Sequence, residues 1–392
     1  MYNPYTPSKT KDISETARAI PGFDVFIFLL QKSFIIKINV IRYIIMSGRK
    51  KVNKNLIWAV ISLILAVLTI RVVLKQSNDL TPAALYLLLK DSDKVFLGLA
   101  FAASLLFIWF EGTAIRSIIK RAGIRKGPLS GLLYSASDIY FSAITPSSTG
   151  GQPASAFFMI RSGISAGITT AALVLNLMMY TLSIIVLGII SVIITPKAFI
   201  DFGTASKVLI IAGFTIMVIL AAVFLLLLKK ESLIFIPASK LITFLSGRKL
   251  IRNKEHLLMK LEKIRHDYKE CSDLISGHKG VLVTAFIWNL LQRTSQIIVP
   301  MLVFAALGGD RSLMPTVFSK QCLITIGYNF VPIPGAMGVS DYLMIDGFNS
   351  IMDRASAFSV ELISRGMTFY VCVLLSGIIT LIGYFAGRKK GR

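Results

Sequence analysis

Six apolar segments, each near or above the length needed to cross a bilayer, constrain this chain more than any other feature. About 20 apolar residues in an α-helix span the hydrocarbon core, and a helix satisfies its own backbone hydrogen bonds there. Since 54% of the 392 residues are hydrophobic, we expect an all-α polytopic membrane protein rather than a soluble fold. The predicted spans are roughly 56–74, 95–115, 164–194, 207–228, 281–307 and 357–386.

The formal net charge of +23 gathers beside these apolar segments. Lys and Arg accumulate in cytoplasmic loops and next to anionic lipid, so we read the charge as a topology signal and expect no specific nucleic-acid partner. The loop 75–94 balances Lys against Asp, which suits the outer side. With both termini cytoplasmic, the segments predicted on the inner side are 49–54, 116–126, 229–280 and 388–390.

Counting crossings between the basic loops singles out two further segments. The basic loops 116–126 and 229–280 both lie in the cytoplasm, and the two spans between them, 164–194 and 207–228, already take the chain out and back. The segment 129–162 must therefore enter and leave the membrane from the cytoplasmic side. The same count requires 313–352 to enter and leave from the outside. The alternative is that each segment contains a full, kinked span.

Both segments contain a break rich in proline and glycine, "TPSSTGGQP" in the first and "VPIPGAMGVSD" in the second. These residues interrupt helices, and non-helical backbone at membrane depth needs protein or a water-filled cavity around it. Breaks that enter from opposite faces predict two re-entrant helical hairpins in an inverted-repeat arrangement, as in transporters. The tripeptide FIW, at 107–109 and 286–288, precedes both segments and supports this weakly.

The pattern divides the chain into four parts. The first 45 residues are apolar, but their charges share no helical face, so we expect a non-native extension with Met46 as the initiator. The parts are the extension 1–45, the first membrane half 46–228, a basic cytoplasmic linker helix 229–280, and the second membrane half 281–392.

The linker carries an apolar stripe on a basic helix. Such a stripe could lie on anionic lipid or pack on a second copy of the chain as a short coiled coil. A simple connecting helix is the default. The stripe consists of Leu257, Leu261, Ile264, Tyr268, Cys271 and Ile275.

Ionisable side chains inside a membrane are functional candidates, because a charge there is expensive. A structural ion pair of Glu111 with Arg293 or Arg365 is the alternative reading. For residues near the segment ends, Arg161, Glu361 and Arg365, we expect snorkelling to the interface. The candidates at depth are Glu111, Asp138, Arg293 and Asp341.

The first break offers hydroxyl groups followed by two glycines, Gly150 and Gly151, which let a ligand approach the backbone closely. Gln152-Pro153 then opens a helix whose N-terminus attracts anions such as phosphate. A tight turn that caps a short helix is the alternative. The chain shows no catalytic constellation and no metal-ligand spacing of Cys or His, so we expect no catalytic residue, metal or cofactor.

The motif "ITPSSTGGQP", with "PIPGAMGVSD" near the C-terminal end, resembles the lysylphosphatidylglycerol synthase/flippase transmembrane family over about residues 50–390. This family includes the membrane half of the bacterial multiple peptide resistance factor. The resemblance implies a bacterial cell membrane protein that moves phosphatidylglycerol or its lysyl ester between leaflets and contributes to resistance to cationic antimicrobial peptides. The chain stops at Arg392, so we expect the family's soluble transferase domain to be absent. Asp341 stands where a family glutamate is expected.

The leading hypothesis is therefore a lipid translocase, whose partners are the membrane and an anionic or aminoacylated phospholipid. A phosphatidylglycerol lysyltransferase, or the membrane component of such a system, is the alternative. A separate lipid-modifying enzyme and a second copy are further candidate partners. The expected substrate-binding residues are Glu111, Asp138, Thr145, Pro146, Ser147, Ser148, Thr149, Gly150, Gly151, Gln152, Arg293, Pro334, Gly335, Gly338, Asp341 and Arg365.

In this hypothesis the positive and the negative groups of the site bind different parts of the head group. Backbone amides around Ser148 to Gly151, together with Arg293 or Arg365, would hold the phosphate. The carboxylates of Glu111, Asp138 or Asp341 would neutralise the amines of a lysyl group.

Overall fold

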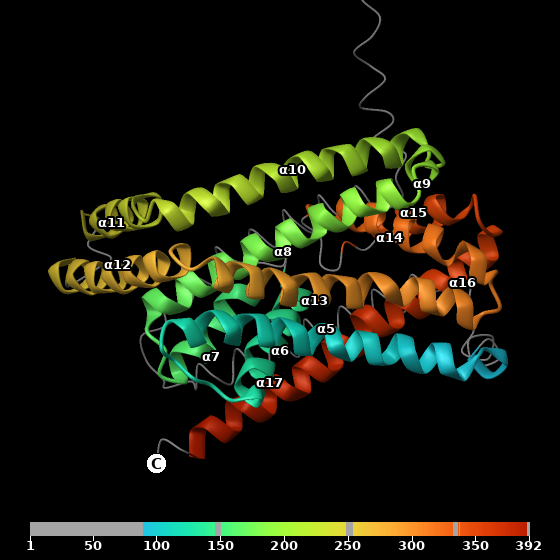
Figure 1. Ribbon diagram of the computed structural model, residues 1–392. Coiled ribbons are helices and arrows are strands. Elements are labelled where there is room, and N and C mark those ends of the chain that lie inside the picture. The colour runs from blue at the N-terminus through green and yellow to red at the C-terminus, as the bar shows by residue number, and fades with distance from the viewer. Residues whose placement is uncertain (1–88, 146–149, 248–253, 332–335, 337, 390–392) are drawn as a thin grey trace, which may run out of the picture. The chain divides into compact units, whose positions relative to one another are not determined.

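The computed structural model describes residues 89–145, 150–247, 254–331, 336 and 338–389. Over these residues the chain is all-helical, with thirteen α-helices, α5 to α17, and no strand (Figure 1). The predicted extension 1–45 and the predicted span 56–74 lie outside the described residues.

Four helical stretches are long and apolar enough to cross a membrane, and they confirm four of the predicted spans. The last is a continuous helix, Arg354–Ala386, with a π-helical segment, Gly366–Val371, at its middle. The four are α5 (Lys94–Arg121), α8 (Ala166–Ile194), α10 (Thr204–Lys229), and α16 (Arg354–Arg365) continued by α17 (Cys372–Lys389).

The span predicted at 281–307 forms a helix, α13 (Lys279–Ala306), but is not among these four. Buried polar residues, among them Asn289, Gln292 and Arg293, interrupt its apolar sequence and lower its mean hydropathy. A helix with this composition belongs in the interior of a helical membrane protein, where neighbouring helices satisfy the polar groups.

Helix α13 packs along α5, and the two helices run antiparallel (Figure 1). At one end the backbone N–H of Asp93 donates to the carbonyl of Ala306 at 2.8 Å. Further along, the rings of Phe110 and Trp288 lie 5.7 Å apart. The two helices that carry the FIW tripeptide are therefore paired with each other.

Both predicted hairpins have the helix–break–helix structure expected from their proline and glycine. The longer arms have 17 and 16 residues, and the shorter arms have 11 and 10. At 1.5 Å per residue the longer arms extend roughly 25 Å, less than the ~30 Å hydrocarbon core. The first hairpin is α6 (Pro128–Ile144) with α7 (Gly151–Arg161), and the second is α14 (Met314–Asn329) with α15 (Val339–Phe348).

Each hairpin packs on the long helix that precedes it and on a long helix that follows the other hairpin. Helix α6 packs between α5 and α17, while α14 packs on α13, α8 and α10. The contact of α6 with α5 depends on two glycines, because a Cβ on Gly112 would lie 2.5 Å from the carbonyl oxygen of Gly131. The apolar core accordingly forms two large clusters, one around each hairpin.

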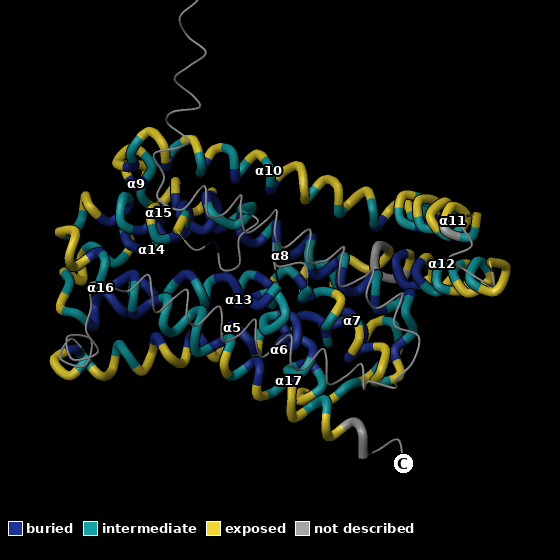
Figure 2. Tube along the Cα trace, turned by 180° about the vertical axis from the view of Figure 1, so that it is seen from behind, coloured by how far each residue is buried: buried dark blue, intermediate teal, exposed yellow. Residues whose placement is uncertain are grey.

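Short elements join the long helices. Helix α9 (Lys197–Ile200) lies between α8 and α10, and a 3-10 turn, Arg311–Leu313, leads into α14. The exposed side chains of α10 are largely apolar, as expected of a surface that faces lipid. Their positions appear as yellow stretches along α10 in Figure 2.

Two helices occupy the predicted linker 229–280, α11 (Ser232–Gly247) and α12 (Lys254–Ser276). The centre of the apolar stripe of α12 packs inside the chain: Tyr268 is fully buried, and its hydroxyl donates to the carbonyl of Leu227 at 3.0 Å. Burial also raises the pKa of the Cys271 thiol to about 12. The centre of this stripe is therefore covered by α8 and by the end of α10, which leaves it unavailable to lipid.

Candidate functional site

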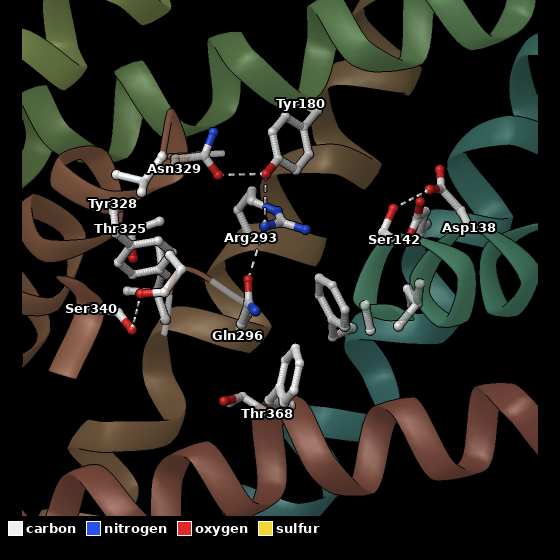
Figure 3. A pocket seen from close by; sticks show the side chains of 18 of the residues that line it. Asp138, Ser142, Tyr180, Arg293, Gln296, Thr325, Tyr328, Asn329, Ser340 and Thr368 are labelled. Atoms are coloured by element: carbon white, nitrogen blue, oxygen red, sulfur yellow. Dashed lines mark hydrogen bonds between the residues drawn. The ribbon is translucent and has the colours of Figure 1, made fainter. Parts of the chain in front are cut away.

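A cavity of about 460 Å³ lies between the two hairpins and the long helices around them. Figure 3 shows Arg293 between side chains of the first hairpin, Asp138 and Ser142, and side chains of the second, including Ser340. Polar groups from both hairpins thus face one space. The charged residues that line it are Glu111, Asp138, Arg293 and Arg365.

Arg293 is the central cation of this cavity, with only 6% of its surface exposed. Its guanidinium stacks on two rings, 4.2 Å from the centre of Tyr180 and 4.8 Å from that of Phe107. Nη1 donates to Oε1 of Gln296 at 2.9 Å. Among the described residues no carboxylate lies within 4.0 Å of it, and its Nε has no hydrogen-bond partner. A buried guanidinium in this state can accept an anion.

Glu111 and Asp138 form a buried carboxyl pair on the same cavity, each only 7% exposed. Oε2 of Glu111 accepts from Ser135 at 3.2 Å and from the amide of Gln292 at 3.1 Å. The two carboxyl groups line the same cavity, and Ser135, which donates to Glu111, lies one turn before Asp138 on α6. The alternative prediction, an ion pair of Glu111 with Arg293 or Arg365, is not formed within 4.0 Å in the described part of the chain.

Asp138 also joins the two arms of the first hairpin. It lies on α6 and accepts from Gln152 on α7 at 2.5 Å, and from Ser142 at 3.1 Å. Gly151 sits directly against this arrangement, and a Cβ there would overlap Oδ1 of Asp138 and the hydroxyl of Ser142. Glycine at 151 is therefore needed for the arms to approach each other.

Thr145 and Gly150, which flank the first break, form a capping turn. Oγ1 of Thr145 donates to the carbonyl of Phe141 at 2.6 Å and accepts from the backbone N–H of Gly150 at 2.9 Å. This arrangement fits the alternative reading of a tight turn before a short helix for these two residues. The remaining expected residues of the break, Pro146, Ser147, Ser148 and Thr149, lie outside the described residues.

Beside the second hairpin, Asp341 of α15 and Glu361 and Arg365 of α16 form a similar set of charges in a closed arrangement. Nε of Arg365 lies 2.9 Å from Oε1 of Glu361, and its Nη2 forms an ion pair with Asp341. Asp341 also accepts from the backbone N–H of Gly338, which has φ +83°, at 2.9 Å. Asp341 and Gly338 therefore begin α15. The expected Pro334 and Gly335 lie outside the described residues.

The snorkelling predicted for Glu361 and Arg365 is wrong. Glu361 is only 4% exposed, and the Arg365 side chain is 11% exposed. Because they neutralise each other at i,i+4 spacing, neither needs to reach the interface. Arg161, by contrast, is exposed and lies over the ring of Tyr384 at 5.0 Å.

Neutral polar residues in and beside the cavity were not predicted from the sequence. Gln292, Gln296, Tyr180 and Ser340 all contact the charged groups described above. On α13 a signal existed, since Asn289, Gln292 or Arg293, and Gln296 recur at spacings of three and four within an otherwise apolar helix. This spacing marks one helix face.

The fold and site define a class of protein: a helical, multi-pass membrane protein with a charged cavity between two broken hairpins. The chain belongs to the family described as the lysylphosphatidylglycerol synthase transmembrane region, which matches residues 56–376. It therefore carries the membrane region of this family. A comparison with curated proteins gave no match.

Proposed function

We propose that this chain is a lipid translocase that passes a phospholipid head group through the cavity while the acyl chains remain in the bilayer. The observation that carries the proposal is the buried Arg293, which lines the cavity without a carboxylate within 4.0 Å among the described residues. A phosphodiester supplies one negative charge and oxygens that match the guanidinium.

The two hairpins support this role as re-entrant elements. Their arms are short relative to the hydrocarbon core. The basic loops, read as cytoplasmic, require the hairpins to enter from opposite faces of a bacterial cell membrane, with both termini inside. Two halves related in this way, 46–228 and 281–392, would alternately open the cavity to each leaflet.

The arrangement of charges narrows the roles expected for individual residues in binding the head group. Arg293, rather than Arg365, is the phosphate ligand in this proposal, because Arg365 is already neutralised by Glu361 and Asp341. Glu111 and Asp138 are the acceptors for head-group amines, while Asp341 has a structural role. Phosphatidylglycerol and lysyl-phosphatidylglycerol are the proposed cargo, and their movement would lower sensitivity to cationic antimicrobial peptides.

The test is a leaflet-exposure assay in proteoliposomes that contain labelled phosphatidylglycerol or lysyl-phosphatidylglycerol. We expect the protein to accelerate equilibration of at least one lipid, and Arg293→Gln to reduce this rate more than tenfold. Arg161→Gln is the matched control, since Arg161 lies on α7 of the first hairpin and outside the cavity lining.

Two outcomes would overturn the proposal. Folded protein that accelerates neither lipid would favour the membrane component of a lysyltransferase system, and new aminoacyl lipid in cells that express the chain would support that reading. Equal loss of rate in Arg293→Gln and Arg161→Gln would remove the cavity from the mechanism.

A further inference from the structure

The carboxyl pair of Glu111 and Asp138 has a chemical property that a head-group site alone does not need. Two ionised carboxylates that face one buried space repel each other strongly, and a proton on one of them removes this repulsion. Both groups are buried, and no Lys or Arg nitrogen within 4.0 Å stabilises two negative charges in the described part of the chain.

The groups that surround the pair are otherwise neutral or lie further away. Arg293 from α13 interacts electrostatically with both carboxyl groups. The remaining neighbours donate hydrogen bonds or line the same cavity. They are Ser135 and Ser142 from α6, Gln152 from α7, Gln292 from α13, the titratable phenol of Tyr180 and the amide of Asn176 from α8, and Val373 from α17.

Unpartnered atoms beside the pair point to a ligand with N–H donors. The amides of Gln152 and Gln292 donate to Asp138 and Glu111, and the Oε1 atoms of both amides are buried without a partner among the described residues. Gln292 itself is only 1% exposed. An ammonium group brings three donors, which suits two carboxyl groups flanked by two free amide oxygens.

The charges of the cavity then fix how many protons the pair holds. With one shared proton the pair carries −1, which balances the +1 of Arg293 in a space where an unbalanced charge is expensive. The ion-paired cluster of Arg365, Glu361 and Asp341 is taken as unchanged when a ligand binds. A lysyl-phosphatidylglycerol head group, with one phosphate and two ammonium groups, brings +1. The net charge of the cavity with its ligand stays unchanged only if the shared proton leaves.

We propose that the Glu111–Asp138 pair is a proton-exchange site, which holds one proton in the empty cavity and releases it when a cationic aminoacyl head group binds. The O–H bond of the shared carboxyl breaks, the proton passes to water, and N–H donors of the ammonium replace it on both carboxylates. This inference rests on the proposed function. It adds that lipid movement is coupled to proton movement, with the cationic lipid and the proton crossing the membrane in opposite directions.

The test measures protons released when purified full-length protein binds lipid in weakly buffered detergent solution. The solution is mildly acidic, so that both lysyl amines are protonated. From charge neutrality in a buried site we expect about one proton released per bound lysyl-phosphatidylglycerol, none for phosphatidylethanolamine, and about one taken up for phosphatidylglycerol. Binding of lysyl-phosphatidylglycerol with no proton release overturns the inference.

Matched variants identify the groups that hold the proton. Asp138→Asn is expected to abolish proton release, while Asp310→Asn, at an exposed turn, leaves it unchanged. If Asp138→Asn fails to fold, Glu111→Gln gives the same test from the other member of the pair. Undiminished proton release from a folded variant of either carboxyl group overturns the assignment.

The two proposals fail in distinguishable ways. Accelerated exchange of lysyl-phosphatidylglycerol between leaflets without proton release would retain the translocase and reject the proton-exchange site. Lipid binding with proton release but no exchange between leaflets would retain the site and reject the translocase.

Discussion

An aspartate, a glutamate and an arginine form a cluster beside each hairpin, yet the two clusters are in opposite states, and only Arg365 of the second cluster lines the cavity. In the first, Asp138 lies beside Glu111 while Arg293 stands apart, stacked on aromatic rings. In the second, Arg365 joins Asp341 and Glu361 in ion pairs. The position of the arginine, rather than the composition of the cluster, decides whether the charges hold the fold together or remain open to a ligand.

The difference has a local cause. Arg365 follows Glu361 by four residues on α16, so helix geometry alone brings the two together. Arg293 instead donates to the neutral Gln296 one turn along α13, and α8 and α5 supply the rings of Tyr180 and Phe107 that hold its guanidinium.

The largest expected effect comes from the glycine of the first break. In Gly151→Ala the added Cβ overlaps Asp138 and Ser142, so the arms must separate, and we expect lipid exchange to be lost. In Gly338→Ala of the second break, the Cβ meets no atom within 4 Å, but the strained backbone, with φ +83° and ψ −47°, costs roughly 1–3 kcal/mol.

Leaflet-exposure rates and unfolding in detergent measure both glycine variants. Gly98→Ala, an open position on α5, is the control for the substitution itself. Normal exchange by Gly151→Ala would show that the close approach of the arms is dispensable.

The next effect concerns stability. Arg365→Gln leaves the buried Glu361 and the partly buried Asp341 without their cation, and we expect the free energy of unfolding to fall by about 3 kcal/mol. Chemical denaturation in mild detergent measures it, and the double variant Arg365→Gln/Glu361→Gln should recover part of the loss. An unchanged free energy of unfolding in Arg365→Gln would contradict the structural role of this cluster.

A smaller loss of stability is expected when Lys320, on α14 of the second hairpin, is replaced. The fully buried Lys320 lies 3.3 Å from Asp201, whose side chain is 38% exposed. In Lys320→Met the remaining carboxylate can be hydrated, so we expect a loss below about 1 kcal/mol in the same unfolding assay. A loss as large as that of Arg365→Gln would mean that exposure of the partner does not decide the penalty.

The smallest effect is a difference in acid sensitivity between the helices that follow the hairpins. Helix α16 is capped by Asp353, which accepts from Ser356 and Ala355, and these hydrogen bonds hold its pKa below the usual range. The stabilisation is present above the ordinary Asp pKa and is lost as pH falls through the lowered folded value. Helix α8 has the non-titrating cap Ser165.

Asp353→Ser should therefore reduce the pH dependence of unfolding in the acid range. The matched substitution Ser165→Asp should introduce such a dependence. Identical pH profiles for Asp353→Ser and the unmodified protein would reject the role of this cap.

The sequence predicted the four long helices and both helix breaks, because hydropathy and proline or glycine act locally along the chain. It also placed Glu111, Asp138 and Arg293 among the candidates, because isolated charges are conspicuous in apolar segments. It misjudged Glu361 and Arg365, because position near a segment end was weighed above their i,i+4 spacing. That Arg293 has no carboxylate partner, unlike Arg365, depends on aromatic rings from α5 and α8, which are distant from it in sequence.

The most direct test of the account compares the two arginines in one preparation, by lipid exchange and by unfolding. The account predicts that Arg293→Gln loses more than tenfold in exchange of phosphatidylglycerol or lysyl-phosphatidylglycerol while its free energy of unfolding changes by less than about 1 kcal/mol. Arg365→Gln/Glu361→Gln should retain exchange. Loss of exchange in the Arg365 double variant, with normal exchange by Arg293→Gln, would contradict the account.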